Sequence, residues 1–311
     1  MSEKLAQARE TSWKHCGKTL TVYLPGMFSL DGRTGAYPAI SITGSHCALQ
    51  CDHCCGTTLD PMIRAMEPSV LVETSLRLAE KGVHGILISG GCDRAGRLPW
   101  EGFLPAIKTI KEKTDLYISI HCGLLDTRTA AGLREAGVDQ ALIDVIGDDE
   151  TYHRIYHVSF GVSRIYETMK VLVRAELPMV PHVVCGLHYG KILGEQRAIE
   201  MISRFPVEQL VIVSLMAIPG TPFRGVIGPS AEEVAAIIAE ARLMMPRVRM
   251  SLGCARRRGD TQMEILALDG GINRMALPSE EALDRAREYG LEIRYQRTCC
   301  SVSRDAAKEA W

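Results

Sequence analysis

The fold of this chain is decided by a short loop, Cys47-Ala48-Leu49-Gln50-Cys51-Asp52-His53-Cys54, in which three thiols are spaced CxxxCxxC. The loop follows a predicted strand, Ala39–Thr43, whose isoleucines and threonine favour extended backbone. Three thiolates can hold three irons of a cubane iron–sulfur cluster, and the fourth iron is then left without a protein ligand. Because an open metal position is a reactive one, the spacing predicts a reactive metal centre at the end of a strand.

A structural zinc ion is the main alternative for these thiols. His46, His53 or Cys55 could supply the fourth ligand that zinc requires. The paired knuckles of zinc ribbons are absent from the sequence, however, and the loop follows the first of a series of strands. Spacing and placement together favour the cluster over zinc.

Outward from this loop, short β-branched runs alternate with amphipathic helical stretches. Such alternation predicts crossover connections and a parallel sheet. The predicted strands are Ala39–Thr43, Gly85–Ser89, Leu116–Ile120, Gln140–Asp144, Val180–Cys185, Leu210–Ser214, Val248–Leu252 and Ile272–Ala276. The predicted helices are Ser69–Lys81, Trp100–Lys113, Thr127–Ala136, Val162–Ala175, Glu195–Arg204, Ala231–Met244 and Glu280–Tyr289.

About eight strand–helix units indicate a (β/α)8 TIM-type barrel, complete or nearly closed. An open doubly wound sheet with a helical addition is the alternative. We expect an N-terminal extension over 1–38, the barrel over 39–290, and a C-terminal tail over 291–311 that can cover the barrel mouth. In such a barrel the chemistry lies at the carboxyl ends of the strands. Candidate residues converge there, namely Cys47, Gly90, Cys92, His121, Cys122, Asp144, Cys185, Pro219 and Cys254.

Composition narrows the class of protein. Hydrophobic residues make up 46% and charged residues 23% of the 311 residues, as in ordinary soluble domains. The net charge of −1 gives no strong attraction to nucleic acid or acidic lipid. We find no signal peptide and no apolar run near the roughly 20 residues of a membrane helix, so we expect a cytoplasmic protein without nucleic-acid or membrane partners.

The chain has 11 cysteines, which is many for a protein of this kind. Disulfides are rare in a reducing cytosol, so the cysteines favour metal binding or redox chemistry. Some can be small core residues instead. We assign Cys122 and Cys185 to the core, because each ends an apolar run.

The cysteine loop after the first strand resembles the radical S-adenosylmethionine (SAM) superfamily. The resemblance implies that Cys47, Cys51 and Cys54 bind a [4Fe–4S] cluster whose open iron takes the amino and carboxylate groups of SAM. An electron from the cluster then cleaves SAM to methionine and a 5′-deoxyadenosyl radical, which abstracts hydrogen from an unactivated carbon. The resemblance also implies that His53 packs on the cluster or on adenine, and that Cys55 is not a ligand.

Further residues are implied to position SAM. Ser89-Gly90-Gly91-Cys92-Asp93 is similar to the superfamily's Gly-Gly-Glu segment, which holds the methionine amino group. Cys92 and Asp93 replace the Glu here, and Asp93 can supply the carboxylate. Asp144 can hydrogen-bond the SAM ribose. Gly186–Glu195 resembles a Gly-rich turn whose terminal Glu contacts the adenine region, which adds Glu195. An ordinary Gly-Gly turn and a helix start at Asp144 are the structural alternatives.

Later segments resemble the biotin synthase-like branch of the superfamily. Pro219-Gly220-Thr221-Pro222 and residues 241–253 match its elements, so the resemblance spans residues 39–290. Biotin synthase itself fits imperfectly. The cysteines of its second cluster correspond to places near Ser119 and near Pro181 or His182.

Several other thiols lack an obvious packing role, and a tail folded over the mouth would bring them together. These are Cys92, Cys254, Cys299 and Cys300, with Cys16 as a further candidate. Four such ligands can hold an auxiliary cluster. A second cluster beside a radical-generating one indicates sulfur insertion, because a cluster sulfide can be sacrificed to a carbon radical. The alternative is a loose tail with chance thiols.

Four phrases resemble the archaeal and bacterial two-protein lipoyl synthase family, namely Tyr23-Leu24-Pro25-Gly26-Met27-Phe28, the cysteine loop with the preceding Ile42-Thr43-Gly44, Ile88–Asp93 and Cys299-Cys300. The resemblance implies that this chain and a paralogous radical SAM subunit insert sulfur into an octanoyl chain on a carrier protein or lipoyl domain. A ferredoxin or flavodoxin would be the reductant. The rivals are another radical SAM reaction of the same branch without sulfur transfer, and a non-catalytic zinc or iron–sulfur protein.

Overall fold

A computed structural model describes residues 1–30 and 32–305 of the chain. In this part, an 11-stranded sheet runs in the order β13-β1-β12-β11-β10-β9-β8-β7-β6-β4-β5, and all its neighbouring strands are parallel. Its strands are β1 (Thr19–Tyr23), β4 (Ala39–Ser41), β5 (Ile63–Arg64), β6 (Gly85–Ser89), β7 (Tyr117–His121), β8 (Gln140–Asp144), β9 (Met179–Cys185), β10 (Gln209–Ser214), β11 (Arg249–Leu252), β12 (Arg274–Ala276) and β13 (Glu292–Gln296). A separate antiparallel pair joins β2 (Ser29–Leu30) to β3 (Arg33–Thr34).

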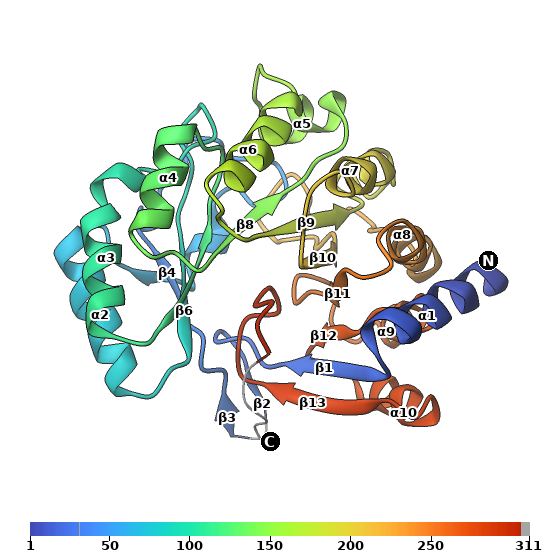
Figure 1. Ribbon diagram of the computed structural model, residues 1–311. Helices are drawn as coiled ribbons and strands as arrows, with labels where there is room; N and C mark the ends of the chain where they lie inside the picture. The colour runs from blue at the N-terminus through green and yellow to red at the C-terminus, as the bar shows by residue number, and fades with distance from the viewer. Residues whose placement is uncertain (31, 306–311) are drawn as a thin grey trace.

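Helices cover the outer face of the curled sheet (Figure 1). They are α1 (Ser2–Cys16), α2 (Pro68–Glu80), α3 (Leu104–Lys113), α4 (Thr127–Glu135), α5 (Asp149–Tyr156), α6 (Ser163–Arg174), α7 (Glu195–Ile202), α8 (Ala231–Met244), α9 (Thr261–Asp269) and α10 (Glu280–Glu288). Short 3-10 helices cover Thr57–Leu59 and Trp100–Gly102. The predicted α/β architecture of TIM type is confirmed, and all eight predicted strands are present within one or two residues of their expected bounds.

The closure of the sheet differs from an eight-stranded barrel. The sheet curls between two edges, β5 and β13, and no ladder joins those edges within the described residues. Two additional strands lengthen the β13 side, because β1 lies between β12 and β13 with Thr21 paired to both Arg274 and Arg294. The lead-in before residue 39 therefore contributes a strand to the main sheet.

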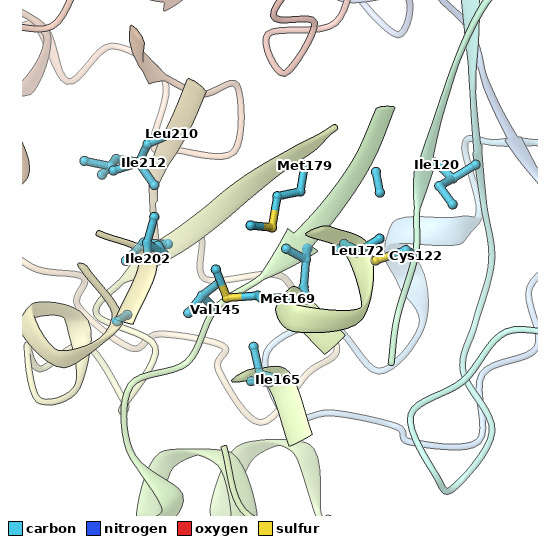
Figure 2. Close-up of a cluster of buried hydrophobic side chains, with 14 of the residues drawn as sticks. Ile120, Cys122, Val145, Ile165, Met169, Leu172, Met179, Ile202, Leu210 and Ile212 are labelled. Atoms are coloured by element: carbon cyan, nitrogen blue, oxygen red, sulfur yellow. The ribbon is translucent and has the colours of Figure 1, made fainter. Parts of the chain in front are cut away.

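The core between sheet and helices follows the helical period. Figure 2 shows Ile165, Met169 and Leu172 of α6 turned toward strand residues such as Met179, and all four are buried. The spacing of i, i+4 and i+7 places the three side chains on one helix face. Full burial of each such side chain stabilises the fold by about 1.5–3 kcal/mol. Cys122 lies in the same cluster, in agreement with its assignment to the core.

Helices α1, α5 and α9 were not among the predicted helices, and α1 and α9 have no strong apolar stripe. In α1 the contact face consists of Leu5 and Ala8, which pack on Ala235 and Ala239 of α8. Two small contacts on a polar helix are too weak a pattern to predict the helix from sequence. Tertiary packing stabilises it instead.

Candidate active site

The cysteine loop leaves the sheet after β4 and is closed by local hydrogen bonds. Gln50 and Cys55 adopt left-handed backbone, with φ of 48° and 45°. The Gln50 side chain donates to the Cys47 carbonyl at 2.6 Å. The Cys55 N–H donates to the Cys51 carbonyl at 2.8 Å. These contacts fold the CxxxCxxC spacing into a compact loop.

The three thiols of this loop interact with one another electrostatically. Burial raises the pKa of the Cys51 thiol well above its usual range, and charge on Cys54 and Cys47 raises it further. Burial also raises the pKa of Cys54. Thiols that disfavour their own ionisation become thiolates when a bound cation offsets the charge. This donor set could therefore hold three irons of a [4Fe–4S] cluster.

In residues 1–30 and 32–305, no three His, Cys, Asp or Glu side chains converge on a single ion-sized point. A cubane does not require that convergence, because each thiolate binds a different iron. His53, beside the last thiol, packs its ring against Tyr156 with centroids 5.2 Å apart. Burial lowers the pKa of His53, which keeps its imidazole neutral near pH 7. Its Nδ1 is buried without a hydrogen-bond partner among the described residues, so it is available to a bound group.

The Gly90-Gly91 turn after β6 packs directly on the cysteine loop. A Cβ on Gly91 would lie 2.1 Å from the His46 carbonyl oxygen and 2.5 Å from Cys47 Cα. The Gly91 N–H donates to Thr43 Oγ1 at 2.7 Å, and the Ala48 N–H donates to the Cys92 carbonyl at 2.8 Å. Glycine is required at 91 because two backbones meet there. The predicted SAM-binding turn and the predicted cluster loop therefore form one unit.

A cavity opens beside this unit at the carboxyl ends of β6, β7 and β8. Its walls include Gly90, Cys92, His121, Asp144 and Tyr156. A second cavity shares Asp144 and Tyr156 with the first and extends to Glu195. We call the two together the mouth cavity. Asp144 belongs to both parts, and its Oδ1 lies 3.7 Å from His121 Nε2, so its carboxylate is placed to meet a polar ligand there.

The other two predicted carboxylates bind backbone instead. Asp93 is exposed, and its Oδ1 accepts hydrogen bonds from the N–H groups of Ala95 and Arg97 at 2.8 and 2.9 Å. Glu195 is buried; its oxygens accept from Gly186 N–H at 2.7 Å and Leu193 N–H at 2.8 Å. Both carboxylates hold a loop in shape. Glu195 also lines the mouth cavity, whereas Asp93 lines an outer hollow that shares Cys92 and Leu98 with that cavity.

A network that sequence reasoning missed holds the cysteine loop from behind. Asp52, between two of the thiols, is buried; its Oδ1 lies 2.7 Å from His157 Nε2, and its Oδ2 accepts from the Tyr189 hydroxyl at 2.7 Å. The Tyr189 ring stacks on Phe223 with centroids 4.9 Å apart. Three distant loops therefore meet at one carboxylate. A lone Asp inside a cysteine motif carries no sequence signal for this role.

A second group of thiols lies inside the curl of the sheet. Cys254, after β11, packs with Cys299 and Cys300 of the tail against Tyr23 and Ala276. A hydrogen bond from Cys300 lowers the pKa of Cys299 to about 6, with a smaller contribution from the His121 ring. The contact with Cys300 also lowers the pKa of Cys254. We call Cys254, Cys299 and Cys300 the inner thiol group.

Two of the expected auxiliary thiols are placed elsewhere. Cys92 interacts with Cys47, and burial raises the pKa of Cys92 to about 12. It therefore belongs beside the cysteine loop and the mouth cavity. Cys16 lies at the end of α1, where its sulfur accepts from Arg242 Nη1 at 3.5 Å. Cys300 to Ser303 of the tail are buried inside the sheet, and Cys299 interacts with His121 of the mouth cavity wall. Residues 306–311 lie outside the described residues.

The chain is similar to known proteins over most of its length. Residues 41–191 match the radical SAM superfamily, and residues 211–307 match the biotin and thiamin synthesis associated domain. Biotin synthase of Halorhodospira halophila is 25% identical over 261 residues, which covers 79% of this chain and 76% of that protein. Biotin synthase of Citrifermentans bemidjiense is 26% identical over 251 residues, covering 75% and 72%.

Among solved structures, methylornithine synthase superposes with a TM-score of 0.66 at 18% identity, covering 94% of this chain and 88% of that one. HydG, a maturase of the [FeFe]-hydrogenase, also gives a TM-score of 0.66 at 14% identity, covering 94% and 68%. These two likenesses concern the fold. The chain belongs to the radical SAM superfamily, in its biotin synthase-like branch. It is a radical SAM enzyme, and its cofactors are a [4Fe–4S] cluster and SAM. In the described part of the chain, no helix is both long and apolar enough to span a membrane.

Proposed function

We propose that this enzyme inserts sulfur into unactivated C–H bonds of a protein-bound octanoyl chain, as one of two cooperating subunits of a lipoyl synthase. The observation that carries the proposal is the inner thiol group, Cys254, Cys299 and Cys300, in which Cys299 interacts electrostatically with His121, a residue of the mouth cavity wall. A second thiol group next to the radical site is what a sulfur donor needs. The similarity to biotin synthases supports sulfur insertion as the type of reaction.

In this proposal Cys47, Cys51 and Cys54 are the ligands of the radical-generating cluster. When bound, that cluster and SAM supply a 5′-deoxyadenosyl radical, which is chemistry that no side chain can perform. The chain's own part is to hold the three thiolates and to keep the loop fixed. Asp52 does the latter through its bonds to His157 and Tyr189.

The remaining predicted residues position SAM, some directly and some through a loop. Gly90 and Gly91 let a ligand approach the backbone at the end of β6. Asp144 presents a carboxylate to the mouth cavity. Asp93 and Glu195 act by holding their loops in shape. Apolar cavity walls exclude water, which protects a radical from side reactions.

The inner thiol group would hold the auxiliary cluster that gives up sulfur. It replaces the wider set that included Cys92, because Cys92 lies beside the cysteine loop. The partners follow from the proposed reaction. They are an octanoylated carrier protein or lipoyl domain, a paralogous radical SAM subunit, and a ferredoxin or flavodoxin as electron donor. These partners place the enzyme in the cytoplasm.

Anaerobic reconstitution of the full chain with iron and sulfide tests the proposal. We expect about eight irons and about eight sulfides per chain, since two cubane clusters are filled. With SAM, a strong reductant, the paralogous subunit and an octanoylated lipoyl domain, mass spectrometry should show sulfur added to the octanoyl chain. The same reaction should release 5′-deoxyadenosine.

Two outcomes would contradict separate parts of the proposal. About four irons per chain would exclude a sulfur-donating second cluster and favour a reaction of this branch without sulfur transfer. Two clusters and 5′-deoxyadenosine formation, with an octanoyl domain of unchanged mass, would reject the octanoyl substrate while keeping the sulfur-donor site.

A further inference from the structure

The chain reverses direction after β13 and enters the curl of its own sheet. The last described segment, drawn in dark red in Figure 1, lies within the ring of strands rather than outside it. Thr298 and residues 300–303 are buried, whereas Arg304 is exposed. We call residues 298–303 the inserted tail.

Side chains from five strands grip the backbone of the inserted tail. Gln209 Nε2 of β10 donates to the Cys300 carbonyl at 2.8 Å, and Gln140 Nε2 of β8 donates to the Ser301 carbonyl at 2.8 Å. Two further hydrogen bonds hold the end of the segment. The hydroxyl of Tyr23 in β1 donates to the Val302 carbonyl at 3.1 Å, and Arg249 Nη1 of β11 donates to the Ser303 carbonyl at 2.8 Å. Arg274 of β12 reaches the same Val302 carbonyl at 3.3 Å.

These contacts explain why two glutamines stand on an inward face that also carries apolar residues such as Leu142 and Val211. A backbone inside a protein must have its carbonyls satisfied, and water is not available there. Gln140 uses both ends of its amide, because its Oε1 accepts from the Ser303 N–H at 3.1 Å. Glutamines at 140 and 209 would be costly in an empty apolar barrel. Their placement fits a barrel that contains this segment.

The inner thiol group depends on the inserted tail. Cys299 and Cys300 both belong to the inserted tail, and of the three thiols only Cys254 comes from the barrel itself. With the tail outside the sheet, a single thiol of the three would remain. A cluster that binds all three thiolates therefore binds only the inserted state, and ligand binding to one state stabilises that state.

We propose that loading of the auxiliary cluster and insertion of the C-terminal tail are linked, with Gln140 and Gln209 as positioning residues for the inner thiol group. The proposal rests on the proposed function, since it takes the second cluster as its ligand. Three Fe–S bonds form on loading, and the thiol protons leave to solvent. A chain that has given up its second cluster holds its tail less firmly, so reloading and tail insertion occur together.

Limited proteolysis of the full chain measures tail insertion without using activity. Trypsin cuts after Arg297 when the buried bond to Thr298 becomes accessible, so the rate of this cleavage reports whether the tail is inserted. A C47A/C51A/C54A background leaves the inner thiol group as the remaining predicted cluster site. In this background, we expect anaerobic loading with iron and sulfide to slow cleavage after Arg297 at least about tenfold relative to the chelated protein.

Variants of the gripping side chains test the second half of the proposal. In the same background, Gln140→Leu with Gln209→Leu should lower second-site iron at least about fivefold and make cleavage after Arg297 insensitive to loading. Thr168→Val is the matched control. Its hydroxyl is buried, accepts from Leu125 N–H at 3.2 Å and lies on α6 away from the tail, so the variant should load like the background protein.

The outcomes separate the two proposals. No iron in the C47A/C51A/C54A background would remove the second cluster, and with it both the sulfur donor and the linkage. About four irons with equal cleavage of loaded and chelated protein would overturn the linkage alone. That comparison uses no glutamine variant, so it stands even where the double variant fails to fold. Normal loading of a folded double variant would overturn the role of Gln140 and Gln209.

Discussion

The two thiol groups of this enzyme are assembled in opposite ways. Cys47, Cys51 and Cys54 come from one loop that is closed by its own hydrogen bonds. The inner thiol group joins Cys254 to the end of a chain that has first passed through the whole sheet. Burial raises the pKa of Cys51 and Cys54 in the first group, whereas in the second a hydrogen bond with Cys300 lowers the pKa of Cys299 to about 6 and the pKa of Cys300 is raised. A local motif thus defines one site, and topology defines the other.

The largest expected effect comes from removing a thiol of the local site. Cys51→Ala should lower the rate of SAM cleavage by about a thousandfold or more, because the radical-generating cluster loses one of its three ligands. Cys55→Ala is the matched control, since this neighbouring thiol is not a predicted ligand. The measurement is 5′-deoxyadenosine formed per chain under anaerobic reduction. Equal losses in the two variants would show that the loop tolerates no change, rather than that Cys51 is a ligand.

Removing a thiol of the inner group should abolish the function of the second site while leaving the first site active. Cys300→Ala is expected to reduce iron from about eight to about four per chain and to abolish sulfur transfer, while SAM cleavage stays within about threefold. Iron analysis and product mass spectrometry measure the two effects. Cys16→Ala, at a thiol held by Arg242 on α1, should keep the full iron content.

Cys92→Ala tests the boundary between the groups. The structure places Cys92 beside Cys47, so its loss should leave second-site iron unchanged. Loss of four irons in this variant would restore the wider ligand set expected from sequence. Loss of SAM cleavage with full iron would instead give Cys92 a role in SAM binding at the mouth cavity.

The same contrast explains what sequence could predict. The strand rhythm and the CxxxCxxC loop are local patterns, and they sufficed for the TIM-type fold and for the radical SAM assignment. Nothing local indicates that Gln140 and Gln209 grip a segment 300–303, because their partners are backbone carbonyls brought in by topology. Asp93 resembled a ligand in sequence, yet its carboxylate caps a turn. A sequence motif shows which residue types are present and how they are spaced. It does not show that a carboxylate already accepts hydrogen bonds from nearby backbone N–H groups.

The network behind the cysteine loop should have an intermediate effect. Tyr189→Phe removes the hydroxyl that donates to Asp52 at 2.7 Å, and Asp52→Asn removes the charge that both partners share. Loss of such outer contacts typically costs 10–100-fold in metal affinity or activity, so we expect about tenfold slower SAM cleavage in each variant. Inner-group iron should not change.

Spectroscopy separates this role from a general structural one. The electron paramagnetic resonance signal of the reduced first cluster, recorded with and without SAM, should change in Tyr189→Phe. An unchanged signal together with a normal rate would show that the Asp52 network does not position the loop. The local site would then depend on its own hydrogen bonds alone.

The smallest expected effect concerns the cap of helix α4, Asp126, which lines the outer hollow and is not one of the proposed cluster ligands or SAM-binding residues. Asp126 caps α4 and accepts from the Thr129 N–H at 2.8 Å; that hydrogen bond lowers the pKa of Asp126 below its usual 3.8. Asp126→Ala should cost about 1 kcal/mol or less in the free energy of unfolding at pH 7, since the group is exposed. A depressed pKa stabilises the fold above the unfolded pKa and stops doing so as pH falls through the folded value. The difference between the two proteins in urea unfolding should therefore hold from pH 7 to pH 5 and narrow below about pH 4.

This weak variant also tests the meaning of the larger ones. Because Asp126 is not a proposed ligand of either cluster, Asp126→Ala should load both clusters normally despite its lower stability. If it lost inner-group iron as Gln140→Leu with Gln209→Leu should, then global stability, rather than the grip on the tail, would govern the second site. The site made by a local motif and the site made by topology would then differ only in how much loss of fold stability each tolerates before it loses its cluster.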